Sequence, residues 1–265
     1  MSDAARERSL QELALARYLE LYYTQGNLRR WVVSCDKVTR ILPSNLKIGG
    51  MVLHEFNFSA ILRIASDINH FLLLINQLQL WEKVLGTFTR DEQHLISLFW
   101  VEPYLNFALL TPYNLKQRII YSGTKSLLLV YANDRRSKII PLPTDEEISM
   151  KTLRKWHDKM NPCHRRLIEA IRRIDAPSLS QPRAYRRKHV HHLPPYLLIG
   201  LQTQVTIGID QNGYTQAVAL QSPVSIDRSI EWCLAEHRLS RIAFAALLRL
   251  FKEQMRPYRN SPSHE

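Results

Sequence analysis

Near the C-terminal end, polar side chains occur at a spacing that suits contact with DNA bases. Glutamine amides can hydrogen-bond to adenine edges, and threonine can meet either a base edge or a thymine methyl group. Alternate residues of a β-strand share one face, so each set points to one side. The candidate base-contacting residues are Gln202, Gln204 and Thr206 in a first β-pattern, and Thr215 and Gln221 in a second. Both patterns carry such groups, so which strand enters a groove stays open.

A cluster of cations lies just before these patterns and suits phosphate contacts. Its members are Arg183, Arg186, Arg187 and Lys188. They end a longer basic stretch, 151–188, which holds twelve Lys or Arg residues against three acids. A solvated surface usually mixes both signs, so this excess favours a polyanionic partner over a plain linker. The histidines at 189, 191 and 192 have no Cys or carboxylate at ligand spacing, so we expect no metal site there.

The elements that would position these groups are a hairpin and two short helices. Strand patterns at 202–209 and 214–221 flank a turn at 210–213, and helical patterns follow at 225–237 and from 240 onward. Ser225 and Ser240 are natural N-caps for the two helices. About forty-five residues in two helices cannot support an independent core. We therefore expect a partner subunit to complete it.

This arrangement resembles the ribbon-helix-helix superfamily of DNA-binding regulators. The match lies in the strand that ends at Gln221, the helix at 225–237 and the string from Leu239 to Leu248. The resemblance implies an intertwined homodimer whose β-ribbon lies in the major groove of double-stranded DNA. It also implies that Ser240 and Arg241 hold a phosphate at the start of the second helix. Arg238 stands where the superfamily's turn usually has glycine.

The rest of the chain is expected to be a helical body. Helical spacing of apolar residues predicts helices at 3–25, from 59 to about 85, from 89 to 101 and, with one break, from 144 to 174. Capping-box patterns at 89–92 and 144–147 predict the starts of the last two. Two β-rich runs, 126–131 and 138–140, predict a hairpin or a pair of connecting strands. The fold class is thus α+β and mostly α. The predicted parts are a helical domain 1–175, a basic linker 176–195, a ribbon-helix-helix-like unit 196–258 and a tail 259–265.

Composition and termini agree with an intracellular DNA-binding protein. Lys and Arg number 36 against 24 Asp and Glu, which gives a net charge of +12. The three cysteines are far apart, which fits a reducing compartment and argues against a disulfide framework. The charged N-terminus does not begin like a signal peptide, and the apolar run 71–75 is too short to cross a bilayer. We expect a cytoplasmic protein without a membrane partner.

Catalytic motifs are weak, and we expect no enzyme and no cofactor. The chain has no glycine-rich phosphate loop and no G-x-S-x-G or H-E-x-x-H pattern. One alternative is a helical ribonuclease that uses Arg154 and His157. The favoured function is sequence-specific regulation of transcription. The run 106–113 before the β-rich stretch is loosely similar to AcaB-type activators of conjugative elements. A DNA-processing accessory protein at an origin of transfer or replication is the other alternative.

Overall fold

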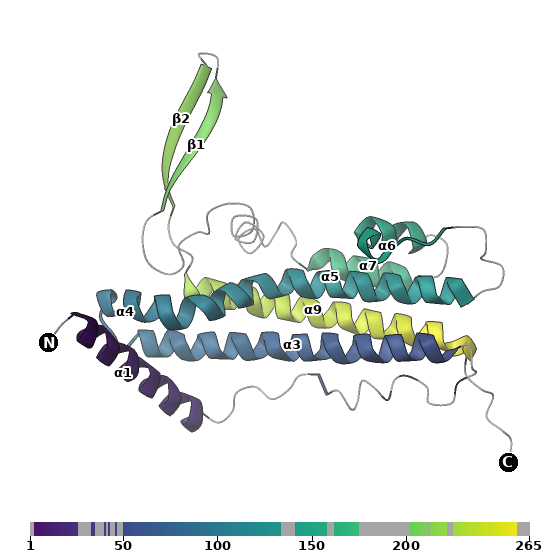
Figure 1. Ribbon diagram of the computed structural model, residues 1–265, viewed down its shortest axis with the longest axis horizontal. Coiled ribbons are helices and arrows are strands. Elements are labelled where there is room, and N and C mark those ends of the chain that lie inside the picture. The colour runs from purple at the N-terminus through teal and green to yellow at the C-terminus, as the bar shows by residue number, and fades with distance from the viewer. Residues whose placement is uncertain are drawn as a thin grey trace. The chain divides into compact units, whose positions relative to one another are not determined.

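The computed structural model describes residues 3–25, 33–34, 40, 42, 46, 50–133, 141–157, 162–174, 202–210, 213–221 and 225–258 (Figure 1). The helices are α1 (Asp3–Thr24), α3 (Met51–Leu85), α4 (Arg90–Ile96), α5 (Glu102–Asn133), α6 (Met150–His157), α7 (Pro162–Arg173) and α9 (Ile226–Met255). The strands are β1 (Gln202–Asp210) and β2 (Gly213–Gln221). The predicted linker 176–195 and tail 259–265 lie outside the described residues.

The chain forms two compact units. Unit 1 contains Met1–Leu28, Leu73–Leu110 and Pro177–Leu234, and unit 2 contains Arg29–Leu72, Thr111–Ala176 and Ala235–Glu265. Three long helices, α3, α5 and α9, contribute a part to each unit, and within a unit these parts lie side by side (Figure 1). Among the described helices, only α3 is long and apolar enough to span a membrane, and 56% of its most apolar window is buried. A helix buried on most sides is typical of a protein core.

In unit 1, stacked aromatic rings fix α1 to the body. Tyr18 of α1 stacks on Trp81 of α3 with ring centroids 4.5 Å apart, and Trp81 stacks on Trp100 at 5.7 Å. Burial of the Tyr18 phenol raises its pKa to about 12. Nearby, the Arg17 guanidinium lies 4.5 Å from the centroid of the Phe88 ring. These contacts bury Tyr18, whereas Leu13 and Leu19 of the same helix remain exposed, so the apolar stripe of α1 is buried only in part.

The helix predicted from 89 to 101 begins as expected but does not end before Pro103. The Glu92 carboxylate accepts a hydrogen bond from the Thr89 backbone N–H at 2.9 Å, so the predicted capping box is confirmed. Residues 97–101 then form a π-helical turn in which the Glu102 N–H donates to the Ser97 carbonyl. Pro103 lacks an N–H and cannot form the α-helical bond, so the preceding turn widens and α5 continues.

In unit 2, α5 also replaces the strand predicted at 126–131. The second run of that prediction, 138–140, lies outside the described residues. Ser126 is fully buried, and its Oγ lies 2.7 Å from the side-chain oxygen of Asn57 and 2.5 Å from that of Gln254. One hydroxyl hydrogen serves only one acceptor, so Ser126 donates to one of the two amides and the other presents its NH₂ group to Ser126. This buried polar contact joins α3, α5 and α9.

The predicted turn in the C-terminal region is absent, because residues 226–255 form one continuous helix. The buried positions of α9 recur at alternate intervals of three and four residues and pass straight through 237–240. The positions of this spacing are Ile230, Cys233, His237, Ser240, Phe244, Leu247, Phe251 and Gln254, and the other buried residues of the helix, Ser229, Glu236, Ala243, Leu250 and Met255, lie directly beside them in the sequence. Such a stripe is the signature of one helix packed along its length. Neither Gly nor Pro occurs between 237 and 241 to interrupt it.

The predicted α+β class with a ribbon-helix-helix unit is therefore wrong, and the chain is mostly helical. A β-α-α unit needs two helices folded back at a turn, whereas α9 is a single helix without a turn. β1 and β2 form a two-stranded antiparallel pair, with Gln202 opposite Gln221 and Thr206 opposite Ala217. This pair is the extended part of the described chain, and the packed layers are helical.

Replacement of Arg238 by glycine distinguishes one helix from two. Arg238 is an exposed interior residue of α9, so Arg238→Gly is expected to lower the free energy of unfolding by about 1 kcal/mol. Arg241→Gly, also exposed on α9, should cost the same amount. Urea unfolding followed by circular dichroism measures both. A neutral or stabilising Arg238→Gly beside a costly Arg241→Gly would show that the chain turns at 238.

A carboxyl pair in unit 1 makes stability depend on pH. The side chains of Glu82 on α3 and Asp227 in the first turn of α9 are hydrogen-bonded, which raises the pKa of Glu82 to about 7. Folding thus retains a proton that the unfolded chain releases. The resulting stabilisation is fully present below the ordinary glutamate pKa and is lost as the pH rises through about 7.

Replacement of Glu82 by glutamine tests this pair. The amide of Glu82→Gln still donates to Asp227 but does not titrate. The urea midpoint of the wild type is expected to fall between pH 5 and 8 more steeply than that of the variant. Parallel pH profiles for the two proteins would contradict the shared proton.

Candidate nucleic-acid interface

The short helices α6 and α7 of unit 2 are strongly amphipathic. On each helix, one side is apolar and buried and the other is charged. The buried apolar side chains are Leu153 and Trp156 of α6 and Leu167, Ile168, Ala170 and Ile171 of α7, and His164 of α7 is buried as well. Four of these positions, Leu153, Trp156, Leu167 and Ile171, belong to the apolar pattern that predicts the broken helix at 144–174. Burial of this stripe holds both helices on the body.

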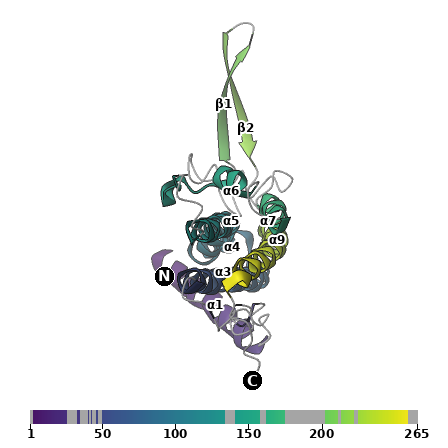
Figure 2. The same cartoon turned by 90° about the vertical axis from the view of Figure 1, so that its right-hand side faces the viewer.

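Close packing against α5 fixes the position of both helices. A Cβ added to Gly123 of α5 would lie 3.0 Å from Leu167 Cδ2 of α7 and 4.0 Å from Leu153 Cδ1 of α6. A side chain at this position would require Leu167 to shift by a few tenths of an ångström, so glycine favours this close approach. The Trp156 ring meets Tyr131 of α5 edge to face, with centroids 4.8 Å apart. Seen from the end in Figure 2, α7 lies against α5 and α9.

Polar contacts fix the ends of the two helices. The second predicted capping box, at 144–147, is present, although it caps a short 3-10 turn (Asp145–Glu147) rather than a long helix. Asp145 accepts hydrogen bonds from Lys125 at 2.5 Å and from the Tyr121 hydroxyl at 3.1 Å, and Lys125 lowers the pKa of this carboxyl. At the other end, Lys116 of α5 donates to the carbonyl of Ile174, just after α7, at 2.5 Å.

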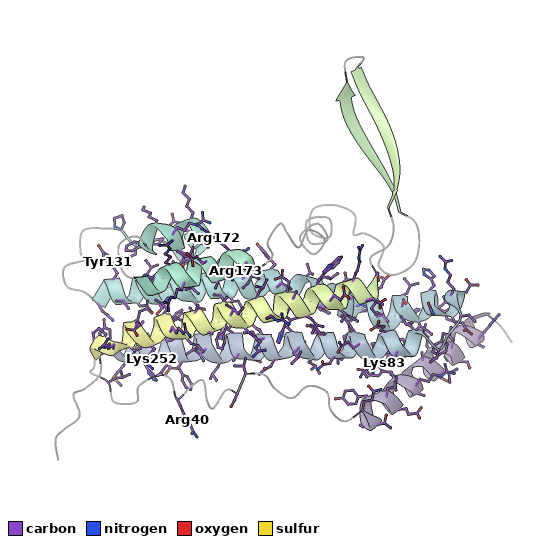
Figure 3. All side chains as sticks on the ribbon, turned by 180° about the vertical axis from the view of Figure 1, so that it is seen from behind. Arg40, Lys83, Tyr131, Arg172, Arg173 and Lys252 are labelled. Atoms are coloured by element: carbon purple, nitrogen blue, oxygen red, sulfur yellow. The ribbon has the colours of Figure 1, made fainter. Side chains whose placement is uncertain are left out.

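The outward sides of α6 and α7 form what we call the basic face. It consists of the exposed residues Lys151, Arg154 and Lys155 of α6 and Arg165, Arg166, Arg172 and Arg173 of α7. Figure 3 labels Arg172 and Arg173 on α7. The one carboxylate on these two helices is Glu169, which pairs with Arg165 at 3.1 Å. Because both partners are more than half exposed, that pair neutralises little of the charge.

The arrangement of cations along α7 opposes the helix dipole at one end. Arg172 and Arg173 lie in its last turn, where positive charge stabilises a helix. Arg165 and Arg166 lie near its start, where positive charge is unfavourable and where no acid occupies the first turn. Positive side chains beside free helix amides form a favourable site for an anion such as phosphate.

The structure places the predicted contact residues in three different settings. Residues 183 and 186–188 lie outside the described part of the chain, as do the histidines at 189–192. The predicted base-contacting residues lie on β1 and β2. The register pairs Gln204 with Ala219 and Gly208 with Thr215. Opposed residues share a face of an antiparallel pair, so the backbone places Gln202, Gln204, Thr206, Thr215 and Gln221 on one face.

Ser240 and Arg241 cannot have the phosphate-binding role that the resemblance implied. Both lie in the interior of α9, where backbone amides are used within the helix. Ser240 is fully buried, and its hydroxyl has no hydrogen-bond partner among the described residues. Arg241 is exposed, but it is separate from any helix start.

The four arginines of α7 were part of the basic stretch noted in the sequence, yet they were not among the predicted contact residues. The spacing of these arginines in the sequence could have identified them. Arg165, Arg166, Arg172 and Arg173 recur at positions one and seven residues apart, opposite the apolar positions 167, 171 and 174. This spacing puts them on one solvent-facing side of a helix.

Replacement of Trp156 by alanine tests whether this side chain anchors α6. Trp156→Ala removes the ring that meets Tyr131 and is expected to cost about 3 kcal/mol. Trypsin should then cleave more rapidly after Lys151, Arg154 and Lys155, as mass spectrometry of the fragments will show. Arg154→Ala, which changes an exposed residue of the same helix, is the control and should leave the other sites protected. Unchanged cleavage in Trp156→Ala would show that Trp156 does not anchor α6.

Comparisons with known proteins found no relative of this chain. The chain matches no protein-family model, no curated protein and no solved structure.

Proposed function

We propose that the protein binds double-stranded DNA through the basic face of α6 and α7 and regulates transcription. The observation that carries this proposal is the concentration of seven exposed cations against one exposed carboxylate on two anchored helices. A polyanion that occupies this face releases its condensed counterions, which is the main source of affinity in sequence-independent DNA binding.

Helix stability alone does not account for this distribution of charge. Arg165 and Arg166 are near the N-terminal end of α7, and Lys151 is near that of α6, which also has no acid in its first turn. Cations at these positions work against the helix dipoles. A phosphate group would satisfy both the cations and the helix amides.

The regulatory part of the proposal rests on the β-hairpin and the basic segment before it. A two-stranded β-ribbon fits the major groove, where base edges can be distinguished. The shared face of β1 and β2 carries three glutamines and two threonines of the predicted set. In this account the basic face and residues 183–188 hold phosphates, and the hairpin distinguishes sequences. Such a regulator works in the cytoplasm.

Salt-dependent binding to a duplex tests the basic face. The variant Arg166→Gln/Arg172→Gln/Arg173→Gln leaves the Arg165–Glu169 pair intact. Fluorescence anisotropy with a labelled duplex is expected to show weaker binding on every sequence. The slope of log affinity against log salt should fall by about 0.9 for each phosphate that the variant no longer neutralises.

A matched control separates this face from overall charge. Arg8→Gln/Arg90→Gln/Lys252→Gln removes three cations that are also exposed, on α1, α4 and α9. This variant should bind nearly as the wild type does. Equal losses of affinity in the two variants would show that net charge and not the basic face governs binding. Absence of duplex binding by the wild type at low salt would refute the function.

A further inference from the structure

We propose that a groove between α3 and α5 in unit 2 binds a small amphipathic organic anion with a single negative charge, such as a carboxylate on an apolar body. The groove has a volume of about 740 Å³, within the size range of small-molecule sites. Its lining includes Phe56, Ser59, Arg63 and Ile64 of α3 and Arg118 and Tyr121 of α5. This site goes beyond DNA binding and does not depend on it.

The apolar part of the groove suits a hydrocarbon body. The buried residues of its lining, which we call the floor, are Ile64, Ala60 and Ser122, of which two are apolar. The rings of Phe56 and Tyr121 lie on opposite helices, with centroids 6.5 Å apart and planes inclined at 56°. An apolar ligand would remove these surfaces from water, which is the main driving force for such binding.

The polar groups leave one free positive charge at the edge of the groove. Arg118 forms an ion pair with Asp67, and the Tyr121 hydroxyl donates to Asp145. Arg63 is exposed and forms no ion pair or hydrogen bond within the described residues. Because Asp67 compensates Arg118, the surplus charge of the groove is that of Arg63. That surplus matches a single carboxylate, which a guanidinium can hold through two parallel hydrogen bonds.

Charge and shape disfavour other occupants. A cationic amphiphile would meet Arg63 and Arg118 without a free carboxylate, because Asp67 is already paired. A DNA strand would place a chain of charges over a floor that is largely apolar. A neutral amphiphile would use the floor but leave Arg63 without a counter-charge.

Calorimetric titration of the full-length protein with three probes of equal chain length tests the proposal. Octanoate, octanol and octylammonium share the apolar chain and differ in charge. We expect saturable binding of octanoate, weaker binding of octanol and none of octylammonium. Arg63→Gln should weaken octanoate binding about fivefold, the effect of one solvent-exposed charge contact, and leave octanol binding unchanged.

Two further variants test whether binding occurs in the groove and whether it depends on Arg63 in particular. Ser59→Trp fills the groove and should abolish binding of octanoate and octanol alike, with circular dichroism as the check on folding. Arg90→Gln removes an exposed arginine of α4, outside both proposed sites, and should bind octanoate as the wild type does. The proposal is overturned if octanoate does not bind, if the three probes bind equally, or if Arg63→Gln and Arg90→Gln have the same effect. DNA binding plays no part in any of these outcomes.

Discussion

The continuous buried stripe of α9 is the constraint on which the rest of the structure depends. Its residues occupy one side of α9 without a break from Ile230 to Gln254. In unit 2 this side meets Phe71 of α3 through His237 and Ser126 of α5 through Gln254. Leu247 of the same stripe lies near Gly123, where α6 and α7 also approach α5. The support of the basic face therefore includes α9.

Rigid support matters for the proposed function because the cations of α7 are arranged at an energetic cost. Positive side chains near a helix start repel the dipole and one another. Anchoring by Trp156, Leu167 and the hydrogen bond from Lys116 to Ile174 offsets that cost, so the charges remain on one surface. A surface organised in this way before it meets DNA loses less conformational entropy on binding.

Local signals in the sequence predicted helices well where periodicity and capping agree. The stripe of α3 and the capping box at Thr89 are examples. At 126–131 and at 237–241, helical periodicity over a long segment outweighs local β-propensity and local capping preference, so both predictions there were wrong. The run 126–131 is rich in residues that favour strands, but in the structure it is part of a helix that packs in the core. Ser240 is a good N-cap, yet here it is a polar member of a buried stripe.

The candidate site was predictable only in part, for a related reason. The excess of cations over 151–188 is visible in composition, but which of them share a surface depends on the orientation of α6 and α7. That orientation comes from packing against Gly123 and Tyr131 of α5, which are far away in sequence. The α3–α5 groove has no sequence motif, because it arises where two helices pack together.

The distance between spin labels at Glu231 and Arg249 tests the continuity of α9 most directly. Both residues are exposed, and they are separated by five helical turns, so the labels would project from the same side. With the native cysteines replaced, pulsed electron paramagnetic resonance should give a narrow distribution of label-to-label distances centred at about 27 Å, because the helix rises 1.5 Å per residue. A distance below about 15 Å, as expected for two helices packed after a turn at 238–240, would contradict the structure described above.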